Sequence, residues 1–206
     1  MIKKIKNSQQ VAEILLDINA IKLQPYDFFT WASGKKSPIY CDNRIILSHT
    51  EAREKIKNLL CETILENFSK TNLIAGVATG AIAHGMMVAD KLKYPFIYVR
   101  TEAKTHGREN QIEGELGEKS NVVVIEDLIS TGGSSINAIK AIEKSGSKVI
   151  GLVSIFTYGF FHKSSISMPS ISLCDYDSLI KVAISRNIIS KKAEEILFEW
   201  QKEQRL

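Results

Sequence analysis

Residues Val122 to Ser135 have the sequence VVVIEDLISTGGSS, and this stretch decides the fold class of the chain. Its β-branched run ends in Glu126 and Asp127, after which a loop of small residues leads into a helical pattern that starts near Ser134. Strand, loop and helix in this order are typical of a parallel α/β sheet, in which ligands bind beyond the carboxyl ends of the strands. We therefore expect both carboxylates to project into a ligand-binding crevice rather than into the core.

Other short apolar runs predict the neighbouring strands of this sheet. They occupy residues Leu73–Ala78, Phe96–Arg100 and Lys148–Thr157, with helical patterns between several of them. Alternation of buried strands with helices predicts a parallel sheet that is covered on both faces. A last strand at 171–175 precedes two more helical patterns, and an amphipathic helix is expected after Ser8. A chain of 206 residues is long enough for one main domain with a small appended subdomain.

The loop after the two acids offers groups that bind a phosphate. Gly132 and Gly133 permit positive φ and close approach of a ligand. Donors come from the helix N-terminus and from the hydroxyls of Thr131, Ser134 and Ser135. Two acids beside this loop would repel a bare phosphate, so the ligand must also carry hydrogen-bond donors, as a ribose phosphate does, or a metal. The residues alone leave one alternative open, a tight turn with both acids solvated at a strand end.

Composition and motifs narrow the remaining function classes. The loop matches neither the Walker A pattern nor the dinucleotide fingerprint. The net charge is +4 and the basic residues are scattered rather than grouped with aromatics, so we expect no nucleic-acid partner. No stretch reaches membrane-spanning length and none resembles a leader, so we expect no membrane partner. The three cysteines, Cys41, Cys61 and Cys174, show no CxxC spacing, which argues against a zinc site and against a disulfide framework. We therefore expect the protein in a reducing cytoplasm.

The stretch VVVIEDLISTGGSS resembles the 5-phosphoribosyl-1-pyrophosphate (PRPP) signature of the type I phosphoribosyltransferases. Other segments resemble one family among them, the orotate phosphoribosyltransferases, and occur in that family's order over nearly the whole chain. Phe29–Arg44 (FTWASGKKSPIYCDNR) is similar to its base-covering segment. Gly76–Gly85 (GVATGAIAHG) is similar to its pyrophosphate loop, and Tyr98–Gly114 (YVRTEAKTHGRENQIEG) to its mobile catalytic loop.

This resemblance implies a fold and a reaction. The expected fold is α/β, a type I phosphoribosyltransferase-like parallel sheet flanked by helices, with a small N-terminal hood subdomain. Within a single domain 1–206, about 1–48 and parts of the C-terminal region would form the hood and about 50–160 the core. The implied reaction transfers a 5-phosphoribosyl group from PRPP to orotate in de novo pyrimidine biosynthesis. Mg²⁺ is the implied cofactor, held chiefly by pyrophosphate and ribose hydroxyls with Asp127 or Glu126 nearby.

The resemblance also assigns roles to residues. Catalysis is expected of Asp127, Lys104 and His106, and orotate binding of Ser130 together with the backbone near Tyr40 and Cys41. No side chain is assigned as a metal ligand. PRPP binding is expected at a larger set of positions: Arg100, Lys104, His106, Glu126, Asp127, Leu128, Ile129, Ser130, Thr131, Gly132, Gly133 and Ser134.

Physical chemistry supports the loop cations independently. Pyrophosphate leaving a ribose carries much negative charge, which Lys104 and His106 would stabilise most at the transition state. In the family this loop reaches across a homodimer into the partner's site, so both residues would act in trans. Neighbouring glutamates offset the basic residues, so charge alone also allows a solvated loop without a catalytic role.

Several cations of other branches of the family are missing here. Those branches have lysine where this chain has Ala32 and Gly80, and a second basic residue where it has Thr101. The pattern instead resembles a shorter bacterial branch. Some relatives also supply an arginine near the position of Phe156–Tyr158 for the orotate carboxylate, and our hypothesis is that Arg44, or backbone amides of the first segment, takes that duty.

Two alternatives to an orotate enzyme remain open from the sequence. One is a phosphoribosyltransferase for a purine base or uracil, and the other is a PRPP-binding regulator. The histidines outside the mobile loop show no metal-ligand pairing, so we expect them to serve in packing, capping or at the surface. They are His49, His84 and His162.

Overall fold

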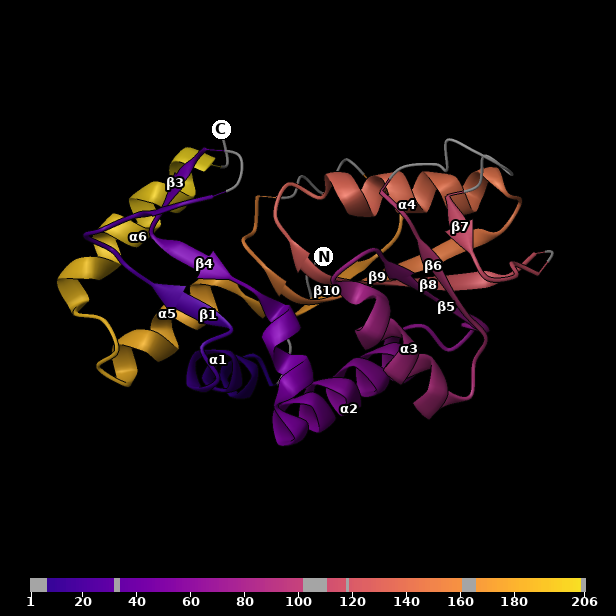
Figure 1. Ribbon diagram of the computed structural model, residues 1–206, viewed down its shortest axis with the longest axis horizontal. Helices are drawn as coiled ribbons and strands as arrows, with labels where there is room; N and C mark the ends of the chain where they lie inside the picture. Colours follow the sequence, from indigo (N-terminus) through magenta and orange to yellow (C-terminus); the bar gives the residue numbers. More distant parts are fainter. Residues whose placement is uncertain (1–6, 32–33, 102–110, 118, 161–165, 205–206) are drawn as a thin grey trace.

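The computed structural model describes residues 7–31, 34–101, 111–117, 119–160 and 166–204. Its centre is a six-stranded sheet in the order β10-β9-β8-β5-β6-β7 (Figure 1). Neighbouring strands in it are parallel except β6 and β7, which pair antiparallel. The expected α/β fold with a mostly parallel sheet is therefore confirmed. The strands are β5 (Leu73–Val77), β6 (Phe96–Val99), β7 (Ile112–Glu113), β8 (Asn121–Ile129), β9 (Lys148–Thr157) and β10 (Ser170–Asp175).

Strand β8 lies inside the sheet and is buried on both of its faces. Side chains alternate along it, so Val123 and Ile125 pack into one hydrophobic core while Val122 and Val124 pack into another. Burial on both faces is why the run before the acids is continuously apolar. The first core contains residues of α1 (Ser8–Asp17), α2 (Thr50–Asn67) and α3 (Ala81–Leu92), and the second contains residues of α4 (Gly133–Lys144) (Figure 1).

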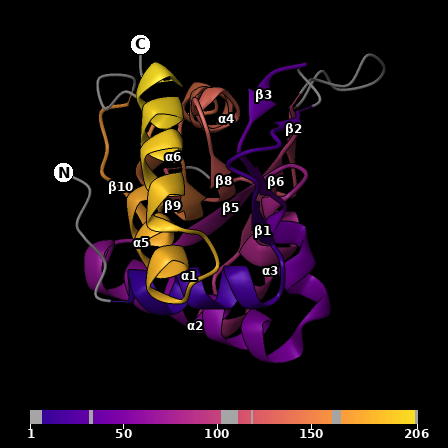
Figure 2. The ribbon, with the colours of Figure 1, turned by 90° about the vertical axis from the view of Figure 1, so that its left-hand side faces the viewer.

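The N-terminal segment forms two small antiparallel pairs beside the C-terminal helix. In the following we call Ile21–Ser48 together with α6 the hood. Trp200 of α6 donates from Nε1 to the carbonyl of Lys36 at 3.2 Å, and the rings of Trp31 and Trp200 meet edge-on at 5.9 Å. Figure 2 shows α6 beside these strands. The elements are β1 (Ile21–Leu23) paired with β4 (Ile39–Cys41), β2 (Phe29–Thr30) paired with β3 (Lys36–Ser37), the 3-10 helix η1 (Asn43–Ser48), α5 (Tyr176–Ser185) and α6 (Lys191–Gln204).

The structure differs from the sequence prediction at two strands. β8 continues past Asp127 because Leu128 and Ile129 still pair with β9. The residues before Gly114, expected to belong to a mobile loop, contain β7, in which Ile112 is buried and pairs with β6. A two-residue edge strand is too short for alternation to reveal it in the sequence.

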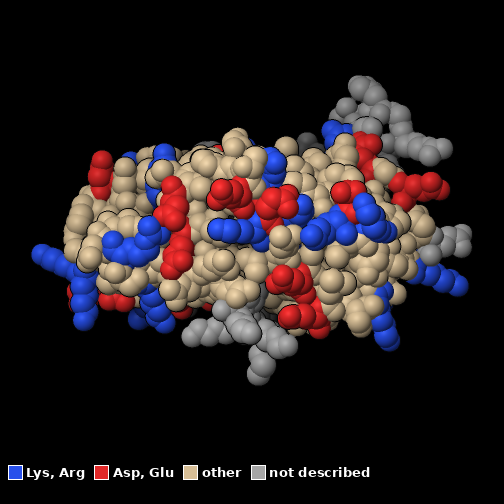
Figure 3. Space-filling view, turned by 90° about the horizontal axis from the view of Figure 1, so that it is seen from below, with Lys and Arg blue, Asp and Glu red and all other residues tan. Residues whose placement is uncertain are grey.

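Figure 3 shows the face of the molecule that lies below the sheet in Figure 1. Basic and acidic side chains lie next to one another there and do not gather into a patch of one sign. Lys57 and Glu54 of α2, for example, form an ion pair at 2.7 Å. Among the helices in the described ranges, none combines the length and the apolar character that a membrane span needs.

Candidate active site

The two acids of β8 point to different faces of the sheet. Residues of β8 alternate, so Glu126 follows Val124 onto the α4 face and Asp127 follows Ile125 onto the α3 face. Glu126 is only 4% exposed, and its Oε2 accepts hydrogen bonds from Ser134 Oγ at 3.1 Å and Ser135 Oγ at 3.0 Å. The expectation that both carboxylates project into the crevice is therefore wrong for Glu126.

Burial controls the ionisation of Glu126. Loss of hydration raises the pKa of Glu126 to about 8, the negative charge of Asp127 adds to the rise, and the two serine hydroxyls oppose it. Ser135 is fully buried and donates to this carboxylate. The prediction that the Ser135 hydroxyl faces a phosphate is wrong, because that hydroxyl holds Glu126 beneath the loop.

The loop after β8 turns into α4 at a left-handed residue. Gly132 is the N-cap of α4 and has φ of +83°, a conformation that favours glycine. Gly133 has no positive φ, and a Cβ added to it would meet nothing within 4 Å. Both glycines permit positive φ, and only Gly132 adopts it. The first amides of an α-helix have no partner inside the helix, so the start of α4 has the kind of geometry that suits an anion.

The other predicted loop residues differ in what they present. Ile129 belongs to β8, its side chain is buried, and its carbonyl accepts from Tyr158 N at 3.1 Å and Thr157 Oγ1 at 3.2 Å. Leu128 and Ser130 are half-buried. The residues of this loop that are exposed to solvent are Thr131, Gly133 and Ser134.

The carboxylate of Asp127 lies against the start of α3. Gly80 is the N-cap of that helix, and a Cβ placed on it would collide with the carboxylate of Asp127. The φ of Gly80 is −60°, which any residue adopts, so glycine is needed here for space and not for backbone freedom. Asp127 therefore lies where the predicted pyrophosphate loop meets the predicted ribose strand, at the positive end of α3.

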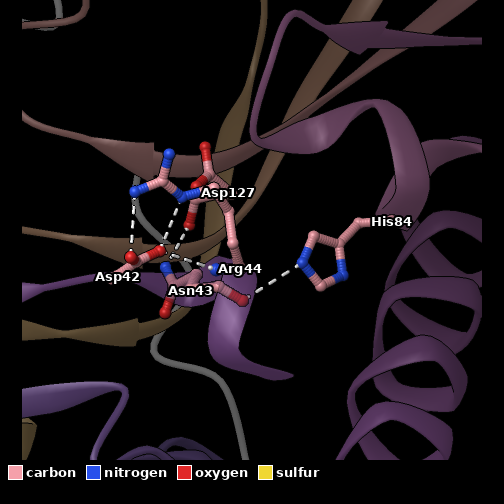
Figure 4. A network of polar contacts seen from close by, with 5 residues as sticks. All are labelled: Asp42, Asn43, Arg44, His84 and Asp127. Carbon is pink, nitrogen blue, oxygen red and sulfur yellow. Dashed lines mark hydrogen bonds and ion pairs between the residues drawn. The ribbon is translucent and has the colours of Figure 1, made fainter. Parts of the chain in front are cut away.

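A polar network ties the hood to Asp127 (Figure 4). Asn43 of η1 is 1% exposed and donates from Nδ2 to the backbone carbonyl of Asp127 at 2.6 Å. The carbonyl of Asn43 lies 3.3 Å from His84 Nε2. Burial lowers the pKa of His84 below its usual value. The burial of His84 agrees with packing, one of the three roles expected for the histidines outside the mobile loop. Asn43 was not among the predicted site residues.

Cations near the site are partly paired. Arg44 donates from Nε and Nη2 to the carboxylate of Asp42 at 2.7 and 2.9 Å, which lowers the pKa of Asp42. The side chain of Arg44 is still 62% exposed. Arg100 follows β6, and its Nη1 lies 3.7 Å from Glu113 Oε1. The predicted catalytic residues Lys104 and His106 lie outside the described residues.

Known proteins resemble this chain in sequence and in fold. Residues 43–186 match the phosphoribosyl transferase domain family. An orotate phosphoribosyltransferase of Staphylococcus epidermidis is 48% identical over 199 residues, which are 94% of this chain and 97% of that protein.

Solved structures share the fold at lower identity. The orotate phosphoribosyltransferase of Aeropyrum pernix superposes with a TM-score of 0.75 at 24% identity, covering 87% of this chain and 99% of that one. The orotate phosphoribosyltransferase of Mycobacterium tuberculosis H37Rv in complex with PRPP gives a TM-score of 0.65 at 20% identity, over 84% and 98% of the two chains. Since sequence identity extends over nearly all of both chains in the Staphylococcus comparison, this protein belongs to the orotate phosphoribosyltransferase family and is a transferase.

Proposed function

We propose that this enzyme transfers the 5-phosphoribosyl group of PRPP to orotate and releases pyrophosphate, forming orotidine 5'-monophosphate in de novo pyrimidine biosynthesis. The observation that best supports this is the position of Asp127 near the carboxyl end of β8, with its carboxylate against the N-terminus of α3 and with the N-terminus of α4 at the end of the loop that follows. PRPP carries an anionic group at each end of its ribose. A strand end that carries this carboxylate, with one positive helix end before it and another after it in the chain, matches that distribution, because each helix end attracts a phosphate group.

The proposed chemistry is a dissociative displacement at the ribose. Positive charge develops on the ribosyl group as pyrophosphate departs, and the carboxylate of Asp127 stabilises it. The loop from Leu128 to Ser134 holds the ribose 5-phosphate through the amides at the start of α4. The serine contacts of Glu126 hold that loop in place. Arg100, Lys104 and His106 neutralise the leaving pyrophosphate, and no residue forms a covalent intermediate.

The donor set near Asp127 fits Mg²⁺ bound through the substrate. Among the described residues no group of three or more His, Cys, Asp or Glu side chains is arranged to hold a metal ion. The carboxyl group of Glu126 accepts hydrogen bonds from two serine hydroxyls, so Asp127 is the carboxylate of this pair that could lie near a substrate-bound metal. Mg²⁺ commonly keeps several waters and binds through one carboxylate plus substrate phosphates. When bound, it would neutralise charge on the pyrophosphate oxygens.

We propose a homodimer in which the loop containing Lys104 and His106 enters the partner's site. The outer face of α3 supports an interface, because Met86 is 46% exposed and Ile82 and Ala83, one turn before it, are only half-buried, as is Met87, one turn after Ala83. An exposed apolar stripe of this kind is typical of a surface that contacts another protein. This stripe belongs to the same helix that begins at Gly80.

Recognition of orotate is assigned to Ser130, to the backbone near Tyr40 and Cys41, and to Arg44. Arg44 projects from the segment after β4 with an exposed guanidinium, and Asp42 holds that group in a fixed orientation. A planar guanidinium binds a carboxylate through two parallel hydrogen bonds. Orotate carries one carboxylate, which uracil lacks.

The reaction is tested by the fall in orotate absorbance with PRPP and Mg²⁺, run beside uracil, hypoxanthine and adenine. Turnover of orotate alone supports the proposal. Turnover of a purine or of uracil in its place would assign the enzyme to another base. If the protein binds PRPP but converts none of these bases, the result would favour the alternative that it is a PRPP-binding regulator.

A further inference from the structure

We propose that Asn43 is a positioning residue for PRPP binding, because its side-chain amide fixes the backbone at Asp127 from the opposing hood. This inference rests on the proposed role of Asp127 at the ribose. Nδ2 of Asn43 donates to the Asp127 carbonyl at 2.6 Å, a short bond between residues 84 positions apart in the sequence. Figure 4 shows the two residues approaching from different elements.

The burial of Asn43 argues for a role other than stability. Its Oδ1 is buried and has no hydrogen-bond partner among the residues that the structure describes. A buried polar atom without a partner costs free energy, so an amide at this position is a poor choice for packing alone. The other half of the same amide makes the bond to Asp127. Asparagine at this position therefore lowers the stability of the fold through Oδ1 and, through Nδ2, contacts the residue at the centre of the proposed site.

The backbone of Asn43 is itself held from a third element. His84 Nε2 of α3 lies 3.3 Å from the Asn43 carbonyl, and α3 begins at Gly80, against which the Asp127 carboxylate rests. Asn43 thus joins η1, β8 and α3 at one point. Loss of its amide would free the Asp127 backbone on the hood side and leave the contact at Gly80 in place.

Asn43→Ala and Asn58→Ala form a matched pair for the test. Asn58 also has a buried Oδ1 without a partner in the described part of the chain, but it lies on α2 and is not part of the proposed site. PRPP affinity is measured by titration calorimetry with Mg²⁺ and without orotate, and Tm is measured in parallel. We expect Asn43→Ala to raise the PRPP Kd about tenfold, equivalent to about 1.4 kcal/mol, and Asn58→Ala to change it less than about twofold. An unchanged Kd in Asn43→Ala, or equal effects of both variants, would overturn the proposal.

Asn43→Asp separates the hydrogen bond from the shape of the side chain. It has nearly the same size, but an ionised carboxylate cannot donate to the Asp127 carbonyl, whereas a protonated one can. Burial should raise the pKa of this new carboxyl group. The PRPP affinity of Asn43→Asp relative to wild type should therefore recover as pH falls from 8 to 6, while the ratio for Asn43→Ala stays constant. A constant ratio for both variants would overturn the role of the donor.

Dividing by wild type at each pH removes the titration of the ligand and of the groups that surround the network. Those groups are Tyr40, Cys41, Asp42, Arg44, His84, Glu126 and Asp127. Failure of the proposed function can be told apart from failure of the Asn43 proposal. If the wild-type protein binds PRPP but does not convert orotate, the proposed reaction is wrong and the Asn43 test is still valid. A wild-type enzyme that does not bind PRPP would overturn both.

Discussion

The carboxylate of Asp127 occupies the space in which a side chain on Gly80 would begin. This contact gives a physical reason for glycine at this position. A side chain at residue 80 and the present orientation of Asp127 exclude each other. The backbone at Gly80 is helical and would accept any residue, so a side chain at this position is excluded only because Asp127 fills the space.

Gly80→Ala should lower activity without lowering stability. The three atoms nearest to the new methyl group all belong to the carboxylate of Asp127, the end of a side chain, so Asp127 must turn while the fold survives. Steady-state kinetics should give a kcat/KM for PRPP reduced by about tenfold or more, a loss of about 1.4 kcal/mol in transition-state stabilisation. Tm should not fall, because alanine adopts this φ more readily than glycine.

Gly117→Ala is the control for this substitution. Its new Cβ would lie 3.6 Å from Ser120 Oγ, an ordinary contact, so kinetics and Tm should both stay near wild type. Full activity of Gly80→Ala would show that Asp127 does not need its present orientation.

The sequence predicted the sheet better than it predicted the directions of the site residues. The run from Val122 to Ile125 located β8 because burial on both faces leaves a continuous apolar signal. The same alternation separates Glu126 from Asp127, and extending it by two residues would have placed them on opposite faces. No local pattern could reveal Asn43, because its partner is 84 residues away and only the folded chain brings them together.

Gly132→Ala and Gly133→Ala should separate stability from ligand binding in the phosphate loop. Alanine at Gly132 must adopt a φ of +83°, which costs about 1–2 kcal/mol, and Tm should fall. At Gly133 the φ is not positive and the new methyl group meets open space, so Tm should be unchanged while PRPP affinity falls. Thermal unfolding and PRPP titration on both variants test this, and equal Tm losses would contradict it.

Glu126 should make stability fall as pH rises above the ordinary glutamate range. Its pKa is raised from 4.5 to about 8, so the native state keeps a proton that the unfolded state has already lost between these values. In this window the free energy of unfolding decreases with pH, by at most about 1.4 kcal/mol per pH unit. Above the native pKa the decrease stops.

Urea unfolding of the wild type and of Glu126→Gln at pH 5, 6, 7 and 8 measures this effect. The variant has no group to titrate at residue 126, so the wild type should lose stability relative to it as pH rises. Groups that do not interact with residue 126 cancel in the difference. A difference that does not change with pH would mean that Glu126 is ionised throughout.

Arg44→Ala should raise the orotate KM and leave the PRPP KM nearly unchanged. A hydrogen-bonded pair of charged groups is worth about 1.5–3 kcal/mol, so the orotate KM should rise by about tenfold or more. Asp42→Asn is the control, because it keeps the guanidinium of Arg44 and removes the negative charge of the group that pairs with it. If Arg44→Ala leaves the orotate KM unchanged, the hypothesis for Arg44 should be dropped in favour of backbone amides in the same segment.

Lys104→Ala should lower kcat far more than it raises the orotate KM, because a cation aimed at the leaving group acts mainly in the transition state. Removal of one such group costs about 100-fold or more in kcat. If the loop acts in trans, co-expression of Lys104→Ala with Asp127→Asn restores one intact site in each mixed dimer, because the first chain supplies Asp127 and the second supplies Lys104. Random pairing of two such chains should give about a quarter of wild-type activity. If the loop acts within its own chain, every site keeps one defect, and the mixture would be no more active than its parents.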